Sequence, residues 1–250
     1  GYVLVNKLKT ICDVFFCDIG HFNESNYYRC DVSSFNQLQN LFKKHKFDYV
    51  FHLGGEFGRW NGEDFYENMW RTNVIGTKNL IRLQEELGFK MIFASSSEVY
   101  GDYEGVMYED VMEKQFIKQK NDYALSKWVS EIQIMNSKEM FNTDTVRVRI
   151  FNTYGPGEYY SYYRSVACRF IYKALMKENY TVYLGHTRTS TYITDLVDTF
   201  TNIPENFRSG EVYNIAGNDY HTIKEMSDEI LELTGRDKKL VKYEENEKFT

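Results

Sequence analysis

Short apolar runs alternate with amphipathic segments along most of the chain. Runs rich in β-branched and aromatic residues predict strands at residues 12–18, 47–53, 89–95, 145–151, 180–184 and 211–215. Between them, residues 35–46 and 74–87 carry apolar side chains at helical spacing. Strands that alternate with helices pair in parallel, and strands as continuously apolar as these suit a sheet covered on both faces. The pattern therefore predicts an α/β fold with a doubly wound parallel sheet.

The spacing of the predicted elements loosens after about residue 155. A tyrosine-rich loop at residues 158–165 is followed by shorter elements. We expect residues 1–155 to form the main sheet domain. We expect residues 156–250 to form a smaller C-terminal region that binds a ligand, with some segments returning to the main sheet.

Composition narrows the class of protein. The 250 residues are 42% hydrophobic, enough for one large core or for a core with a satellite domain. No run approaches the roughly 18 apolar residues of a membrane span, and no secretory pattern opens the chain, so we expect a cytoplasmic protein without a membrane partner. The net charge of −6 argues against a nucleic-acid partner. The four cysteines form no zinc-type pattern, so we expect reduced packing residues and no metal site.

A tyrosine and a lysine four residues apart give the strongest local chemical signal, in NDYALSKWVSE at residues 121–131. This spacing places Tyr123 and Lys127 on one face of a predicted helix. An ammonium beside a phenol favours the phenolate, so we expect Tyr123 to act as a base although its free pKa is ~10. In a chain with 21 tyrosines, such a pair also arises by chance.

The strand predicted at 89–95 ends in Ser95, and two more serines and the carboxylate of Glu98 follow it. Ligands of open α/β sheets bind beyond the carboxyl ends of the strands. Ser96 can hydrogen-bond the same substrate oxygen as Tyr123 and polarise it. Serines also occur at ordinary strand ends, but a carboxylate near a buried strand end is usually paired or functional, which leaves Glu98 to be explained. Ser96, Glu98, Tyr123 and Lys127 are therefore the candidate catalytic residues.

These motifs resemble those of the extended short-chain dehydrogenase/reductases that modify nucleotide sugars, such as UDP-galactose 4-epimerase, dTDP-glucose 4,6-dehydratase and UDP-glucuronate decarboxylase. The resemblance covers essentially all 250 residues. Its landmarks, in chain order, are Asp18, CDV at 30–32, HLGG at 52–55, TNVIGT at 72–77, SSSEVYG at 95–101, YALSK at 123–127, RIFNTYGPG at 149–157 and RTSTYITDLV at 188–197. It implies a Rossmann-like fold, NAD as the cofactor and a nucleoside-diphosphate sugar as the substrate.

The same resemblance bears on the start of the chain. GYVLVNKL resembles the last glycine and the following helix of the family's GxxGxxG fingerprint, so Gly1 is expected at the cofactor pyrophosphate. The first strand and the first two glycines are expected upstream of residue 1, and part of the C-terminus beyond residue 250. Residues 1–155 would then be an NAD-binding domain without its first strand, and residues 156–250 mainly the substrate-binding region.

The resemblance also implies which residues bind the cofactor. Asp18 resembles the acid that hydrogen-bonds the adenosine ribose, and its charge would repel a 2′-phosphate, which favours NAD over NADP. Asp31 and Val32 are expected to flank the adenine. The other cofactor-binding residues that the resemblance implies are Leu53, Gly54, Gly55, Tyr123 and Lys127.

Substrate contacts and a dimer are further implications of the resemblance. Ser97, Asn152 and Arg188 match substrate-binding positions, and a guanidinium suits the oxygens of a diphosphate. Arg188 is open to a second interpretation as a solvated loop residue. Relatives usually dimerise through the helix that carries YALSK, and here Leu125 and Trp128 give this helix apolar surface on more than one side. An ordinary buried helix would show a similar pattern; together with the resemblance, this surface leads us to expect a homodimer.

The residues after Ser96 bear on the reaction that follows oxidation at C4 of the sugar. Dehydratases of the family have Asp then Glu there, whereas this chain has Ser97 then Glu98. Glu98 therefore favours a dehydratase or a decarboxylase, and a simple 4-epimerase or C4 dehydrogenase stays open. A dinucleotide-binding regulator without turnover is the alternative from another class, since fold does not fix function.

Overall fold

The computed structural model describes residues 1–245, which form two compact units. Residues 1–150 and 197–215 make up the first unit. The second unit contains residues 151–196 and, within the described range, residues 216–245. Over the described range, no helix is both long enough and apolar enough to cross a membrane.

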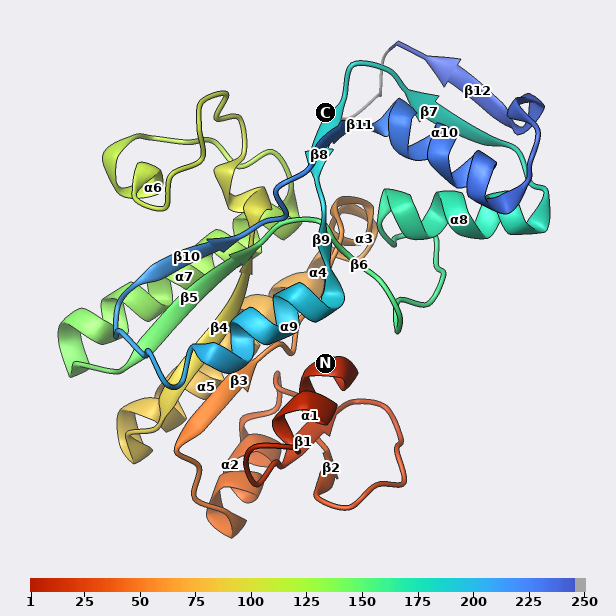
Figure 1. Cartoon of the computed structure of the whole chain (residues 1–250). Coiled ribbons are helices and arrows are strands. Elements are labelled where there is room, and N and C mark those ends of the chain that lie inside the picture. Colours follow the sequence, from red (N-terminus) through yellow and green to blue (C-terminus); the bar gives the residue numbers. More distant parts are fainter. Residues whose placement is uncertain (246–250) are drawn as a thin grey trace. The chain divides into compact units, whose positions relative to one another are not determined.

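The first unit is built on parallel strands (Figure 1). Its sheet has the order β10–β5–β4–β3, made of β3 (Tyr49–His52), β4 (Lys90–Ser96), β5 (Thr145–Ile150) and β10 (Val212–Ile215). A separate parallel pair joins β1 (Phe16–Asp18) to β2 (Tyr27–Arg29). Parallel neighbours need crossover connections, and helices supply them here. The predicted α/β fold with a parallel sheet is confirmed.

Helices cover both faces of the four-stranded sheet (Figure 1). On one face lie α5 (Gly76–Leu87) and α7 (Asp122–Phe141). On the other lies α9 (Ile193–Asn202), which belongs to this unit from Val197 onward; the ring of its Phe200 is 6.5 Å from that of Phe51 in β3. The unit also contains α1 (Tyr2–Leu8), α2 (Phe35–Lys44), α3 (Arg59–Asp64), α4 (Tyr66–Trp70), a π-helical turn (Arg71–Ile75), a 3-10 turn η2 (Ser97–Tyr100) and α6 (Val111–Lys114).

The core of the first unit forms where α2 and α5 pack against the sheet. Leu38 of α2, Leu80 and Leu83 of α5, and Met91 and Phe93 of β4 are all buried in one cluster. Full burial of a side chain of this size contributes about 1.5–3 kcal/mol. This cluster holds in place the strands whose carboxyl ends carry the candidate residues.

The second unit has its own core beneath a parallel pair, β7 (Tyr180–Tyr183) and β12 (Val241–Glu244). The helices α8 (Val166–Met176) and α10 (Ile223–Thr234) pack against each other and bury apolar side chains with β7. A capping box starts α10, because Thr222 and Glu225 each accept the other's backbone N–H. The remaining elements are β6 (Thr153–Tyr154), β8 (Thr187–Thr189), β9 (Thr191–Tyr192), β11 (Tyr220–Thr222) and a 3-10 turn (Lys238–Leu240).

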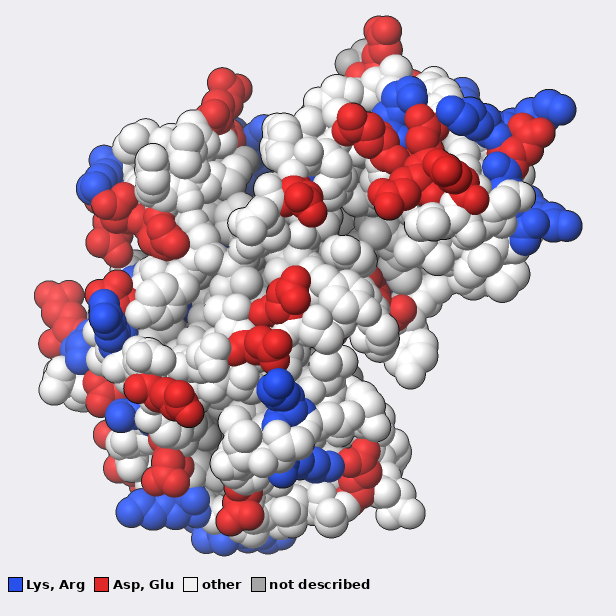
Figure 2. Space-filling view, viewed as in Figure 1, with Lys and Arg blue, Asp and Glu red and all other residues white. Residues whose placement is uncertain are grey.

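Charges of both signs are interspersed on the face shown in Figure 2. On that face, among the residues coloured by charge, Lys and Arg lie between Asp and Glu and form no continuous basic stripe. Nucleic-acid binding relies on such a stripe, because phosphate contacts supply most of the non-specific affinity. This face therefore lacks the electrostatic footprint of a nucleic-acid surface.

Candidate active site

The end of β4 turns sharply into η2, and Ser96 is the residue at the turn. Its backbone is extended (φ −145°, ψ 149°), and its Oγ accepts the N–H of Glu98 at 3.2 Å. A side-chain cap of this kind satisfies a backbone donor that the short helix leaves open. Ser96 is buried and Glu98 is half-buried, so the turn presents a hydroxyl and a carboxylate together at the strand end.

The helix that carries Tyr123 begins beside this turn. Asn121 is its N-cap, and the Asn121 Oδ1 accepts the N–H of Ala124 at 2.8 Å. The Asn121 Nδ2 also donates to Glu98 Oε2 at 3.4 Å. One side chain therefore caps the first turn of α7 and contacts the carboxylate of Glu98, which brings Tyr123 and Glu98 to the same site.

The side chains of Tyr123 and Ser96 meet at this site. Burial raises the pKa of Tyr123 to about 12; the Ser96 hydroxyl lowers this pKa, and the carboxylate of Glu98 raises it. The pKa of the phenol is thus raised in this structure, whereas the ammonium of Lys127 was expected to favour the phenolate. The physical reason is that desolvation of the hydroxyl dominates, and the extent of burial is not visible in the spacing of the two residues.

Lys127 is buried with its ammonium turned toward β4. Its Nζ donates to the carbonyl of Ala94 at 2.9 Å. Burial lowers the pKa of Lys127 to about 8, and the charge of Glu131 opposes this shift. Because an ammonium has three donors, the bond to Ala94 leaves two for the hydroxyls of a ligand.

Gly54 and Gly55 follow β3 and allow close approach of the backbone. A Cβ on Gly55 would lie 3.0 Å from Asn73 Oδ1 and 3.3 Å from Lys127 Nζ. A Cβ on Gly54 would lie 3.0 Å from a methyl carbon of Val32. A Cβ at either position would be closer to its neighbours than ordinary van der Waals contact allows. The absence of a side chain at Gly54 and Gly55 therefore leaves room for Val32 and Lys127. The preceding residue, Leu53, is exposed.

Two aspartates lie at the carboxyl ends of β1 and β2. Asp18 is exposed, and its Oδ1 accepts the N–H of Gly20 at 3.0 Å. The Asp31 Oδ1 accepts the N–H of Ser33 at 2.8 Å. These local turns fix each carboxylate at its strand end. An acid in this position fits the hydroxyls of an adenosine ribose, which are the groups a dinucleotide presents there.

Gly1 and the substrate candidates occupy simpler surroundings. Gly1 is the N-cap of α1, and nothing lies within 4 Å of the position a Cβ would take. Ser97 is half-buried next to Ser96 in the first unit. The structure places Asn152 and Arg188 in the second unit.

Asn152 and Arg188 lie close to each other along neighbouring backbone segments of that unit. Asn152 has a φ of 32°, and its Nδ2 donates to the carbonyl of Thr189 at 3.0 Å. Arg188 lies in β8 and donates from Nη1 to the carbonyl of Thr187 at 2.9 Å. A guanidinium has five N–H donors, so this bond leaves others for an anion.

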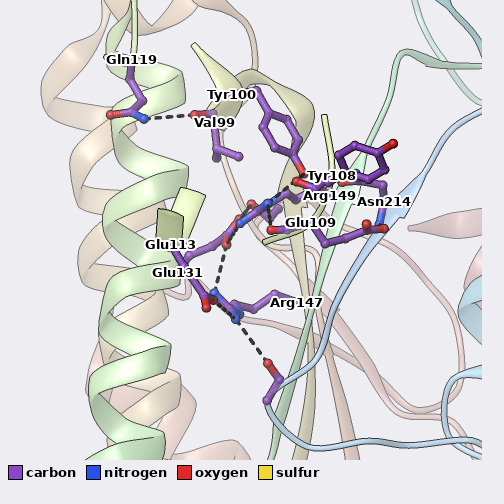
Figure 3. Close-up of polar contacts among 12 residues, drawn as sticks. Val99, Tyr100, Tyr108, Glu109, Glu113, Gln119, Glu131, Arg147, Arg149 and Asn214 are labelled. Atoms are coloured by element: carbon purple, nitrogen blue, oxygen red, sulfur yellow. Dashed lines mark hydrogen bonds and ion pairs between the residues drawn. The ribbon is translucent and has the colours of Figure 1, made fainter. Parts of the chain in front are cut away.

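A buried ion-pair network that sequence reasoning missed joins α7 to β4 and β5 (Figure 3). Glu131 accepts from Arg149 Nε at 3.0 Å and Nη2 at 2.9 Å, and also from Ser95 Oγ. Arg149 donates in addition to the hydroxyl of Tyr100 at 2.8 Å. Glu131 lies four residues after Lys127, on the helical face of Tyr123 and Lys127, and this spacing was the available signal.

Arg59 is a second residue that sequence reasoning missed. It is the first residue of α3, and it forms an ion pair with Glu98 at 3.0 Å. The two residues are 39 positions apart and share no motif, so only the folded chain shows the pair.

The described residues 1–245 contain no group of three His, Cys, Asp or Glu side chains that could hold a metal ion. All four cysteines are free thiols. Cys30 is buried, as expected of a packing residue, whereas Cys12 is exposed.

Comparisons with known proteins identify the family from the sequence. A family model described as the NAD dependent epimerase/dehydratase family matches residues 7–216. UDP-N-acetyl-alpha-D-glucosaminuronate decarboxylase of Bacillus cytotoxicus is 31% identical over 210 residues, which cover 82% of this chain and 64% of that relative. The chain thus spans somewhat less than two thirds of this relative's length.

Solved structures show the same fold. The UDP-glucose 4-epimerase of Thermotoga maritima, solved with UDP-glucose, has a TM-score of 0.87 at 21% identity, with 98% of this chain and 82% of that chain covered. The dTDP-glucose 4,6-dehydratase of Bacillus anthracis, solved with NAD, has a TM-score of 0.76 at 23% identity, with 98% and 73% covered. The resemblance inferred from the motifs is confirmed: this chain belongs to the NAD dependent epimerase/dehydratase family.

Proposed function

We propose that the protein is an NAD-dependent enzyme that oxidises C4 of a nucleoside-diphosphate sugar and then acts on the 4-keto sugar as a dehydratase or a decarboxylase. One observation carries the proposal. The side chains of Ser96 and Tyr123 come together at the end of β4, with Glu98 next to them. Membership of the NAD dependent epimerase/dehydratase family supports it.

The residues around the strand ends fit NAD. In this proposal Asp18 binds the adenosine ribose, Asp31 and Val32 flank the adenine, and Gly1 lies at the pyrophosphate. The segment from Leu53 to Gly55 runs beside the cofactor. Tyr123 and Lys127 bind the nicotinamide ribose, for which the ammonium of Lys127 has donors left. When bound, NAD supplies the acceptor for a hydride from C4 of the sugar.

The protein's own residues handle the protons. Tyr123, as the phenolate, takes the proton of the C4 hydroxyl and becomes the neutral phenol, while the Ser96 Oγ hydrogen-bonds the same sugar oxygen. Lys127, whose pKa burial lowers to about 8, can exchange a proton with its surroundings near neutral pH. A phenol with a pKa of about 12 needs this local support to act as a base.

Glu98 is the basis for favouring chemistry beyond C4. A ketone at C4 makes the hydrogen on the neighbouring carbon acidic, and a carboxylate beside Ser96 and Tyr123 is placed to remove it. A simple 4-epimerase or a C4 dehydrogenase has no use for such a base. These two reactions remain the alternative within the same active site.

The second unit and α7 complete the proposal. Asn152, Arg188 and Ser97 are the residues proposed to bind the substrate, and the guanidinium of Arg188 suits its diphosphate. Helix α7 exposes the apolar residues Leu125, Ile132, Met140 and Phe141. Exposed apolar positions along one helix fit a homodimer contact, which light scattering on the purified protein would measure.

Replacement of Tyr123 by Phe tests the function directly. The protein is incubated with NAD and with UDP-glucose, UDP-glucuronate or dTDP-glucose, and reduced cofactor and product mass are followed. Turnover should fall by about 10²–10⁴ in Tyr123→Phe, because a general base is lost. A product lighter by water indicates a dehydratase, and one lighter by carbon dioxide a decarboxylase. Near-normal turnover in Tyr123→Phe would refute the proposal.

A matched Tyr→Phe change elsewhere serves as the control. Tyr243 lies in β12, and its hydroxyl donates to Asp228. Tyr243→Phe should keep wild-type turnover, since this residue is outside the candidate site.

A further inference from the structure

Glu98 is held by donors from two elements that flank it. From α3, Arg59 donates through Nε to Oε2 at 3.0 Å and through Nη2 to Oε1 at 3.4 Å. From the start of α7, Asn121 donates through Nδ2 to Oε2 at 3.4 Å. Two oxygens and three N–H groups fix both the position and the plane of the carboxylate.

The two oxygens of Glu98 are unequally engaged. Oε2 receives two donors, one of them at 3.0 Å, whereas Oε1 receives a single donor at 3.4 Å. A two-bond fork from a guanidinium is directional, because the planar group matches the plane of a carboxylate. Oε1 therefore keeps the greater capacity to accept a proton, and the two bonds from the Arg59 guanidinium set the direction in which Oε1 points.

The local backbone places Arg59 for this contact. Gly58, its N-cap, has a φ of 90°, a conformation that L side chains rarely adopt. This turn starts α3 and directs the first side chain of the helix toward η2. The Arg59 and Glu98 side chains are 34% and 29% exposed, so the pair lies at an accessible position and not within the core.

We propose that Arg59 is a positioning residue for Glu98, and that it serves proton transfer at the carbon next to C4 but not the removal of hydride from C4. The inference rests on the proposed function and assigns a separate step to a residue outside the Tyr123, Lys127 and Ser96 group. Direct contacts support the separation, because Arg59 bonds to Glu98 whereas Lys127 bonds to Ala94, and Glu98 acts on Tyr123 only through its charge.

The step balances without a further reactant. A C–H bond next to the C4 ketone breaks, and its proton forms an O–H bond at Glu98 Oε1. The electron pair moves into the enolate of the ketone, whose oxygen lies with the hydroxyls of Tyr123 and Ser96. The reverse transfer returns the proton, so in heavy water the carbon acquires deuterium.

Deuterium exchange and cofactor reduction separate the two steps. The protein is incubated in heavy water with NAD and whichever of UDP-glucose, UDP-glucuronate and dTDP-glucose gives the most reduced cofactor. Mass spectrometry measures deuterium on the sugar, and absorbance measures reduced cofactor. In Arg59→Gln, exchange should fall by about 10²-fold or more while the rate of cofactor reduction stays within about threefold. Arg59→Lys, which keeps the charge but not the fork, should recover part of the exchange.

Two further variants keep the test decisive. Glu98→Gln should lose exchange, whether or not Arg59→Gln is stably folded. Arg82 is an exposed arginine of α5, and Arg82→Gln should match the wild type in both measurements. Unchanged exchange in Arg59→Gln, or an equal loss of both signals in a folded variant, would overturn the assignment. If the wild type shows neither deuterium exchange nor cofactor reduction, the proposed function itself is refuted, and with it the role assigned to Arg59.

Discussion

Removal of the charge of Glu131 tests how far the buried network holds the site together. The side chains of Glu131 and Arg149 have no exposed surface, and two bonds of 3.0 Å and 2.9 Å join them. Glu131→Gln keeps the size of the side chain but replaces one acceptor oxygen by an N–H₂ group that faces the guanidinium. Arg149 keeps its bond to Tyr100 but loses its counter-ion inside the protein.

The expected loss of stability is large. Breaking a buried ion pair by removing one partner costs about 3–5 kcal/mol, because a charge is left uncompensated. In a domain of this size, 1 kcal/mol shifts the melting temperature by about 2–4 °C, so the midpoint should fall by about 6–20 °C. Since Glu131 also bonds to Ser95, next to Ser96 in β4, turnover should fall together with stability.

Urea unfolding and thermal melting of Glu131→Gln measure this loss. The matched control is Glu139→Gln, the same change at an exposed position of α7, which should stay within about 0.5 kcal/mol of the wild type. A loss for Glu131→Gln no greater than that of the control would show that the network does not stabilise the site.

Three more changes test separate parts of the account. The pKa of Lys127 is lowered from 10.5 to about 8, so between pH 8 and pH 10.5 the unfolded chain binds more protons than the folded one. The free energy of unfolding of the wild type should therefore rise with pH in this range, by up to about 1.4 kcal/mol per pH unit. Lys127→Met should abolish this rise in urea unfolding; the same pH profile of stability in the wild type and the variant would contradict the lowered pKa. Gly55→Ala should weaken NAD binding about tenfold in calorimetry, because the new methyl group displaces Asn73 or Lys127 at a cost of about 1–3 kcal/mol. Unchanged NAD affinity would show that the backbone at residue 55 does not need to approach these side chains closely. Asn121→Ala should destabilise α7 by about 0.5–2 kcal/mol through loss of the cap, and an unaltered melting temperature would show that the cap is dispensable.

Hydrophobic pattern was sufficient for the main strands and insufficient at the edges of the first unit. The run at 89–95 became β4 (Lys90–Ser96), because it is continuously apolar and buried. The run at 12–18 formed a strand only from Phe16, and Tyr27–Arg29 formed a strand that no pattern indicated. Both strands are three residues long and pair with each other, so tertiary contacts decide their limits.

In the candidate site, too, some residues could be predicted from local sequence spacing and others could not. Ser96 and Glu98 are neighbours in sequence, and Tyr123 shares one helix turn with Lys127, so local spacing could predict these groups. Arg59 approaches Glu98 from 39 residues away, which no local pattern encodes. Burial, which sets the pKa of Tyr123, is likewise a property of the folded chain.

Transfer of the hydrogen on C4 is the most direct test of the central claim. The protein is given NAD and a nucleotide sugar that carries deuterium at C4, the reaction is quenched during turnover, and the reduced cofactor is weighed by mass spectrometry. If C4 is oxidised by NAD, the deuterium from C4 of the sugar is transferred to the nicotinamide ring, and the mass of the reduced cofactor rises accordingly. Product formation with an unlabelled reduced cofactor would contradict oxidation at C4.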